Sequence, residues 1–416
     1  MALSWRGKIG GGRNRSKRME RVLTYELHTE DLERTAGGLV NLVLKNCIRV
    51  TGHEISTTKF TPGGITCDGA AVRVSDRMKP GQVLRVVLPE KEDAGKLIPT
   101  AGALRVLYED EDLLAVDKPA GEAVHPCPGH YMDTTANHAA YYLCADGADA
   151  SGGLRIAGRL DKEASGVLVF AKNRAAAARL QRQRRDGRFV RIYLAVCEGA
   201  FPEAQRGTIS LPLEKVPGER MKMRVFKAPL NSEGGQDRMP HPLPAVTHYE
   251  VLAQGAGRSL LRISIETGRT HQIRVHMAAI GHPLVGDSLY GRQAQSSEHQ
   301  KSVSAPQPAH TKSMPAARAE AKVMPSMPAE EDFMPAVPAE DAESMPSPHA
   351  EDAASIPSPC AEDAASRALL HAVRVRLEQP FTGEKIRIDA PVPADLRAGM
   401  KFAKDIADLF SEADGS

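Results

Sequence analysis

Long apolar runs, paired cysteines and an excess of one charge are all missing from this chain of 416 residues, whose formal net charge is +2. No apolar run approaches the length of a membrane span, so we expect no transmembrane helix. The six cysteines are scattered and none forms a Cys-x-x-Cys pair. That pattern favours reduced thiols in a cytoplasmic protein over a disulfide framework or a zinc site.

Positive charge is nevertheless concentrated at the start of the chain. The first 21 residues contain seven basic side chains and one acid, Glu20, in a Gly-rich context. We predict a basic arm without regular structure over residues 1–24, suited to contacts with phosphate. The alternatives are a targeting peptide or a solubilising tail. A secretory signal is disfavoured because the segment has no apolar core.

Residues 25–90 are expected to form a small α/β unit of their own. Residues 39–45 have helical apolar spacing, and the Asp68-Gly69 pair predicts a hairpin turn. The unit resembles the RNA-binding module of the S-four ribosomal type, which implies RNA contacts through basic residues such as Lys45 and Arg49. Its helical part has few basic residues, so the alternative is a packing domain that has lost its RNA contacts.

The most informative segment is residues 158–173, GRLDKEASGVLVFAKN. An Arg-Leu-Asp triplet leads into a Ser-Gly turn and then an apolar strand over residues 167–170. Asp161 should therefore lie on a loop held by β-structure, with the guanidinium of Arg159 close by. Such a loop can hold a catalytic group rigidly and leave it open to a large substrate. For the triplet alone, an ordinary exposed aspartate would be the simpler interpretation.

This segment resembles the signature of the RNA pseudouridine synthases, in the branch that modifies large-subunit ribosomal RNA. Three further blocks resemble the same family in the same order: residues 107–121, ending in Lys-Pro-Ala-Gly; residues 191–196, with Tyr193; and residues 266–291, ETGRTHQIRVHMAAIGHPLVGDSLYG. Shorter matches at residues 370–372 and 380–384 extend the resemblance over residues 104–395, apart from an insertion.

The resemblance implies an α+β fold with a mixed, mostly antiparallel central sheet, preceded by the small N-terminal α/β module. We expect the catalytic domain in two parts, residues 100–292 and 367–410. Between them, residues 293–366 carry an 11-residue repeat rich in Pro, Ala, Glu and Asp. Prolines and low apolar content predict a disordered acidic insertion there. A long insertion is tolerated because loop-closure entropy grows only logarithmically with length.

The resemblance also implies roles for three side chains in a reaction that breaks the glycosidic bond of a uridine, rotates the uracil and rejoins it through carbon. Asp161 would be the catalytic carboxylate, and Arg274 the guanidinium that pairs with it. Tyr193 would stack on the uracil and handle a proton at C5. No cofactor and no metal are implied.

A uridine in folded RNA must be flipped out of its stack to reach such a site. Arg159 would fill the vacated space or bind a phosphate. Lys118, His125 and His271 are the other predicted RNA contacts in the catalytic domain.

Three positions depart from the common pattern of the family. Gly158 stands where many relatives have His, Ala164 where Thr is usual, and Arg191 where Lys is frequent. None of these changes affects the three catalytic positions, so we expect activity to persist. Substrate choice is the property that they put in doubt.

We therefore expect a cytoplasmic, monomeric enzyme that isomerises uridines in structured RNA, with ribosomal RNA favoured over transfer RNA, and without a membrane or metal partner. The alternative is a catalytically silent RNA-binding factor of ribosome assembly on the same fold. The presence of Asp161, Tyr193 and Arg274 argues against it. A base deaminase would need zinc ligands that include a Cys-x-x-Cys element, which the chain lacks.

Overall fold

The computed structural model describes residues 21–88, 97–145, 154–201, 206–219, 221–226, 242–292 and 367–401. The predicted insertion over residues 293–366 lies outside the described residues, as do the first 20 residues of the basic arm predicted over residues 1–24. Residues 21–24 belong instead to a strand, β1 Arg21–Glu26. Among the described helices, none is long and apolar enough to cross a membrane.

The N-terminal part forms a four-stranded antiparallel sheet in the order β1-β4-β2-β3. Its elements are β1 Arg21–Glu26, α1 Val40–Asn46, α2 Gly52–Thr58, β2 Ile65–Cys67, β3 Ala70–Ala71 and β4 Val83–Leu88. Asp68 and Gly69 join β2 to β3 with φ of 48° and 84°, as an Asp-Gly hairpin turn requires. The predicted turn is therefore confirmed, and α1 confirms the helix predicted from apolar spacing.

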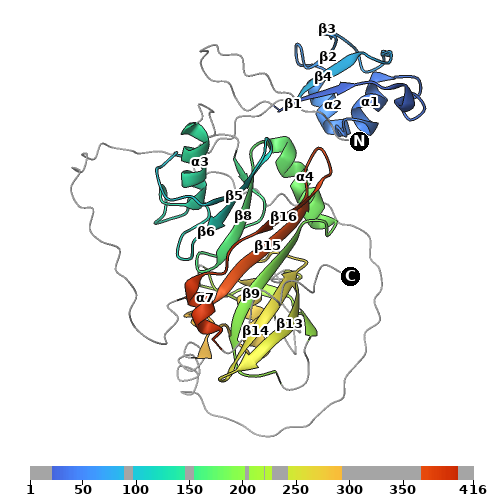
Figure 1. Cartoon of the computed structure of the whole chain (residues 1–416). Helices are drawn as coiled ribbons and strands as arrows, with labels where there is room; N and C mark the ends of the chain where they lie inside the picture. The colour runs from blue at the N-terminus through green and yellow to red at the C-terminus, as the bar shows by residue number, and fades with distance from the viewer. Residues whose placement is uncertain are drawn as a thin grey trace, which may run out of the picture. The chain divides into compact units, whose positions relative to one another are not determined.

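The described residues from 97 onward contain a larger sheet, in the order β10-β13-β14-β9-β15-β8-β6-β5, with β16 beside β15 and β7 beside β8 (Figure 1). Its strands are β5 Val106–Glu109, β6 Leu113–Lys118, β7 Arg155–Ile156, β8 Ser165–Ala171, β9 Val190–Glu198, β10 Arg206–Ser210, β13 Val246–Gly255, β14 Arg258–Ile265, β15 Leu370–Glu378 and β16 Lys385–Asp389. The pairs are antiparallel except β8 with β15, which run parallel. The expected mixed, mostly antiparallel sheet is confirmed.

Strand β15 follows the insertion in sequence but lies between β8 and β9, as the red strand in Figure 1 shows. His371 is level with Ser165 on β8, and Ala372 is level with Tyr193 on β9. At Gly166 an added Cβ would lie 2.2 Å from the carbonyl oxygen of Ala372. The predicted Ser-Gly turn is wrong, because Ser165 and Gly166 are the first two residues of β8. Position 166 needs glycine so that β15 can approach β8.

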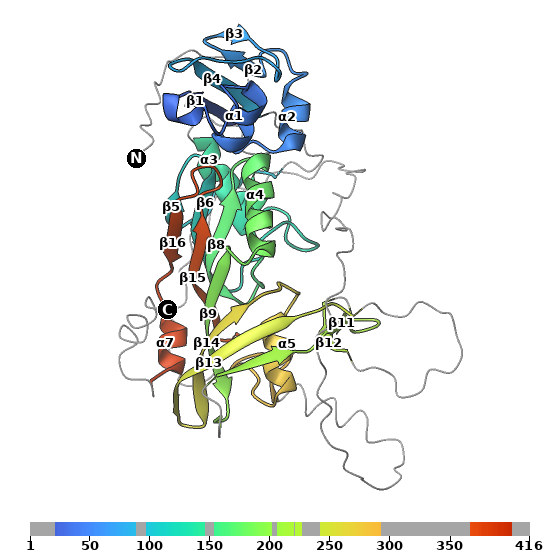
Figure 2. The ribbon, with the colours of Figure 1, turned by 90° about the vertical axis from the view of Figure 1, so that its right-hand side faces the viewer.

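Helices cover parts of this sheet (Figure 2). They are α3 Thr135–Ala145, α4 Arg174–Arg185, α5 Gln272–Ala279 and α7 Ala394–Gly399. Helix α4 packs on β8 and β15. Asn173 begins α4 by accepting the N–H of Ala176 at 2.8 Å, a standard way to satisfy an N-terminal donor.

Candidate active site

Asp161 lies in the loop of residues 157–164, which connects β7 to β8 (the catalytic loop). Its side chain is half-buried, while Arg159 is exposed. The carbonyl of Asp161 accepts the N–H of Ala164 at 3.1 Å, and Arg159 donates to the hydroxyl of Thr270 at 3.2 Å. The second contact joins the catalytic loop to the block of residues 266–291, so two segments distant in sequence form one site.

Three buried cations bind carbonyl oxygens of the catalytic loop. Arg191 donates to Arg159 O at 2.9 Å, Lys118 to Lys162 O at 3.2 Å, and Arg367 to Glu163 O at 3.1 Å. The cations come from β9, from β6 and from the residues just before β15. Because hydrogen bonds from charged donors are stronger than neutral ones, these contacts hold the backbone on both sides of Asp161 against the sheet.

Lys118 is fully buried, with 0% of its side chain exposed. Its ammonium also donates to Pro119 O at 2.6 Å and Glu122 O at 2.7 Å, and burial lowers its pKa to about 8. A side chain whose donors all face the protein interior cannot bind RNA, so the prediction of an RNA contact at Lys118 is wrong. The residue supports the catalytic loop instead.

Arg191 occupies a slot that Gly158 leaves open. A Cβ at Gly158 would lie 2.5 Å from Nη2 of Arg191, and one at Gly268 would lie 3.6 Å from the same atom. The two departures from the family pattern at Gly158 and Arg191 therefore belong together: without a side chain at 158, the larger guanidinium fits beside the catalytic loop.

Tyr193 lies on β9 with only 3% of its surface exposed. Burial raises the pKa of its phenol, the nearby Arg191 opposes that shift, and the charge of Asp161 adds to it. Asp161 is therefore close enough to act on Tyr193 electrostatically. The small exposed fraction means that the ring must become accessible before a uracil can stack on it.

Arg274 lies on α5 and forms a buried bidentate ion pair with Asp287, with both N···O distances at 2.7 Å. Burial works to raise the pKa of Asp287, but the ion pair and the N–H groups of Leu289 and Tyr290 hold it below its usual range. Asp161 contributes to the raised pKa of Arg274. In this structure the direct partner of Arg274 is thus Asp287, and Asp161 acts on it at longer range.

The remaining predicted RNA contacts differ in exposure. His125, Lys45 and Arg49 are exposed; at His125, desolvation and then the charge of Arg159 lower the imidazole pKa. His271 is buried and pairs through Nδ1 with the hydroxyl of Tyr290 at 2.9 Å. The structure thus leaves His125, Lys45 and Arg49 available to RNA, whereas His271 serves the packing of α5.

Sequence reasoning missed Arg367, which is the first described residue after the insertion. Its Nε donates to Asp395 on α7 at 2.6 Å, and its Nη2 donates to the hydroxyl of Ser165 at 3.2 Å. Together with its bond to Glu163, these contacts link the end of the catalytic loop to α7. The signal in the sequence was its place just before the Leu370-His371-Ala372 match.

Replacing Arg367 with Gln should lower kcat by about tenfold to a hundredfold, because small displacements of a catalytic group cost that much. KM for RNA should change little, since Arg367 is buried. Arg367→Lys should recover part of the loss. Steady-state kinetics would measure kcat and KM separately. Arg188→Gln is the control, because Arg188 forms an exposed surface ion pair. A rise in KM at unchanged kcat would contradict the positioning role.

The buried His371 makes stability depend on pH. Its Nδ1 pairs with the hydroxyl of Ser165 at 2.9 Å, and burial lowers its pKa to about 4. The unfolded chain binds this proton near pH 6.5, so stability should fall as the pH drops from about 6.5 to 4, by about 3 kcal/mol. Urea unfolding across that range should show a flatter profile for His371→Asn than for His53→Asn, a control at an exposed histidine. Equal slopes would contradict the prediction.

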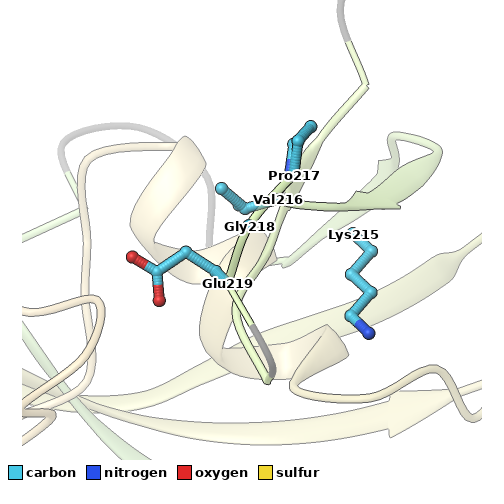
Figure 3. A pocket seen from close by; sticks show the side chains of 5 residues that line it. All are labelled: Lys215, Val216, Pro217, Gly218 and Glu219. Atoms are coloured by element: carbon cyan, nitrogen blue, oxygen red, sulfur yellow. The ribbon is translucent and has the colours of Figure 1, made fainter.

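A hollow lies on the turn between β11 (Leu213–Lys215) and β12 (Met223–Val225). Its walls are Lys215, Val216, Pro217, Gly218 and Glu219 (Figure 3). None of the residues discussed above lines it. The candidate active site therefore rests on the catalytic loop and its neighbours.

Comparison with known proteins points to one family. The family model described as RNA pseudouridylate synthase matches residues 112–279. The uncharacterized RNA pseudouridine synthase YlyB of Bacillus subtilis is 37% identical over 231 residues, which cover 55% of this chain and 71% of that protein.

Two further relatives match this chain with similar identity and coverage. The uncharacterized RNA pseudouridine synthase YhcT of Bacillus subtilis is 41% identical over 216 residues, covering 51% of this chain and 66% of that protein. Ribosomal large subunit pseudouridine synthase D of Pseudomonas aeruginosa is 38% identical over 229 residues, covering 55% and 66%. In these two relatives the match thus spans just under two thirds of their length.

Proposed function

Because this chain belongs to the RNA pseudouridine synthase family, we propose that it isomerises uridine to pseudouridine in RNA, with Asp161 as the catalytic carboxylate. The supporting observation is the catalytic loop itself. Asp161 is half-buried, its loop is held by three buried cations, and Tyr193 and Arg274 lie within its electrostatic range.

In the proposed reaction the C1′–N1 bond of the uridine breaks, the C1′–C5 bond forms, N1 gains a proton and C5 loses one. No group outside the RNA and the protein is needed for that balance. Asp161 supplies the carboxylate next to the ribose. The raised pKa of Tyr193 keeps its phenol protonated near neutral pH. Arg274, oriented by Asp287, provides positive charge within electrostatic range of Asp161.

The substrate is proposed to be structured RNA, with ribosomal RNA favoured over transfer RNA. One relative is named for the large ribosomal subunit, which supports this choice. Residues 25–90 are proposed as an RNA-binding module, with Lys45 and Arg49 exposed on it. We further propose that the protein is a monomer and acts in the cytoplasm.

The test is tritium release from RNA labelled at C5 of uridine, with ribosomal and transfer RNA pools assayed separately. We expect release from the ribosomal pool. Binding of either pool without any release would instead support the catalytically silent assembly factor.

A further inference from the structure

A tight turn of residues 127–130 lies beside the catalytic loop. Cys127 N donates to His130 O at 2.9 Å and His130 N donates to Cys127 O at 2.8 Å. Pro128 and Gly129 form the corner, and Gly129 has φ of +89°. Proline followed by a glycine with positive φ is the sequence preferred by type II turns. The residue that follows, Tyr131, therefore leaves the turn from a fixed position.

His130 ties this turn to the residue after Asp161. Its Nε2 lies 3.0 Å from Nζ of Lys162, and its Nδ1 lies 2.6 Å from the carboxylate of Asp133. Since an ammonium can only donate, Nε2 accepts from Lys162 and Nδ1–H donates to Asp133. The carbonyl of Lys162 is in turn held by Lys118. The turn and the catalytic loop thus form one continuous, hydrogen-bonded rim.

Two large apolar side chains on this rim face solvent. Tyr131 is 64% exposed and Met132 is 49% exposed. Exposed apolar groups next to each other often mark a binding surface. The exposed cations Lys162 and Arg159 lie on the adjacent catalytic loop, and the nearby acid, Asp133, is engaged by His130. An aromatic face beside cations is the combination that binds a single-stranded nucleic acid, through base stacking and phosphate contacts.

We propose that Tyr131 is a stacking site for an unpaired nucleobase of the RNA substrate, close to the target uridine, with Lys162 binding the intervening backbone. This inference rests on the proposed function and narrows it. The preferred substrate presents its uridine in a loop or bulge whose neighbouring base is free to stack. A base paired within a helix cannot use the site.

The stack forms in the bound state and away from the bonds that change, so its loss should raise KM and leave kcat at saturating RNA nearly unchanged. Tyr131→Ala should raise KM for the reactive RNA pool by roughly fivefold to a hundredfold, the range of one base–aromatic stack. Tyr131→Phe should stay close to the parent protein, because it keeps the ring. Tyr141→Ala, at a 48% exposed tyrosine on α3, is the matched control.

The two proposals can be told apart. If the intact protein releases tritium but Tyr131→Ala has the same KM as Tyr141→Ala, the stacking site is wrong and the proposed function stands. A Tyr131→Phe variant as impaired as Tyr131→Ala would also overturn it, since the hydroxyl would then carry the effect. If neither the intact protein nor any variant releases tritium, the proposed function is wrong. The equilibrium affinities of Tyr131→Ala and Tyr131→Phe for the same RNA then decide the stacking site alone.

Discussion

Replacing Asp161 with Asn should abolish tritium release while leaving RNA affinity nearly unchanged. The substitution keeps the shape of the side chain and removes the carboxylate that serves as nucleophile or base. The three buried cations that hold the loop bind its backbone carbonyls, so the loop should keep its position. A loss of at least about a thousandfold is expected, as for the removal of an essential catalytic group.

Glu163→Gln is the matched control, because it removes one carboxylate from the same loop. It should retain most of the activity of the parent protein, and filter binding should give similar RNA affinities for both variants. Turnover by Asp161→Asn within tenfold of the parent would show that another group performs the chemistry.

Replacing Asp287 with Asn should produce the largest loss of stability. Asp287 and Arg274 have exposed fractions of 0% and 4%, and the change would leave a guanidinium buried without its counter-charge. Breaking a buried ion pair on one side costs about 3–5 kcal/mol. Activity should fall as well, because Arg274 loses the partner that orients it toward the site. Urea unfolding and tritium release would measure the two effects.

The double variant Arg274→Met/Asp287→Asn separates these effects. It leaves no buried charge without a partner, and the amide oxygen can still accept the N–H groups of Leu289 and Tyr290. The double variant should therefore regain most of the unfolding free energy but not the activity. Asp186→Asn, in an exposed pair with Arg188, should cost less than about 1 kcal/mol. A double variant as active as the parent would remove Arg274 from the catalytic set.

The candidate site was partly predictable because some of its signals are local. The loop position of Asp161 follows from an Arg-Leu-Asp triplet beside an apolar strand, and the β2–β3 turn follows from Asp68-Gly69. Each of these depends on backbone preferences and on side chains a few residues apart.

The roles of four buried charged side chains could not be predicted in the same way: those of Lys118, Arg191, Arg367 and Asp287. A lysine is exposed in most proteins, and nothing near Lys118 in sequence shows that two loops cover its ammonium. The partners of these side chains are distant in sequence and come together only when β6, β8, β9 and β15 form one sheet.

The sequence by itself therefore determined the family, the mixed α+β fold and the loop that carries Asp161, because motif order and short-range patterns encode them. Only the tertiary structure decided which cations support that loop, that Arg274 pairs with Asp287, and that Tyr131 is exposed next to His130, which contacts Lys162. The physical reason is that burial and ion pairing depend on strand order and register, and these are set by contacts between residues far apart in the chain.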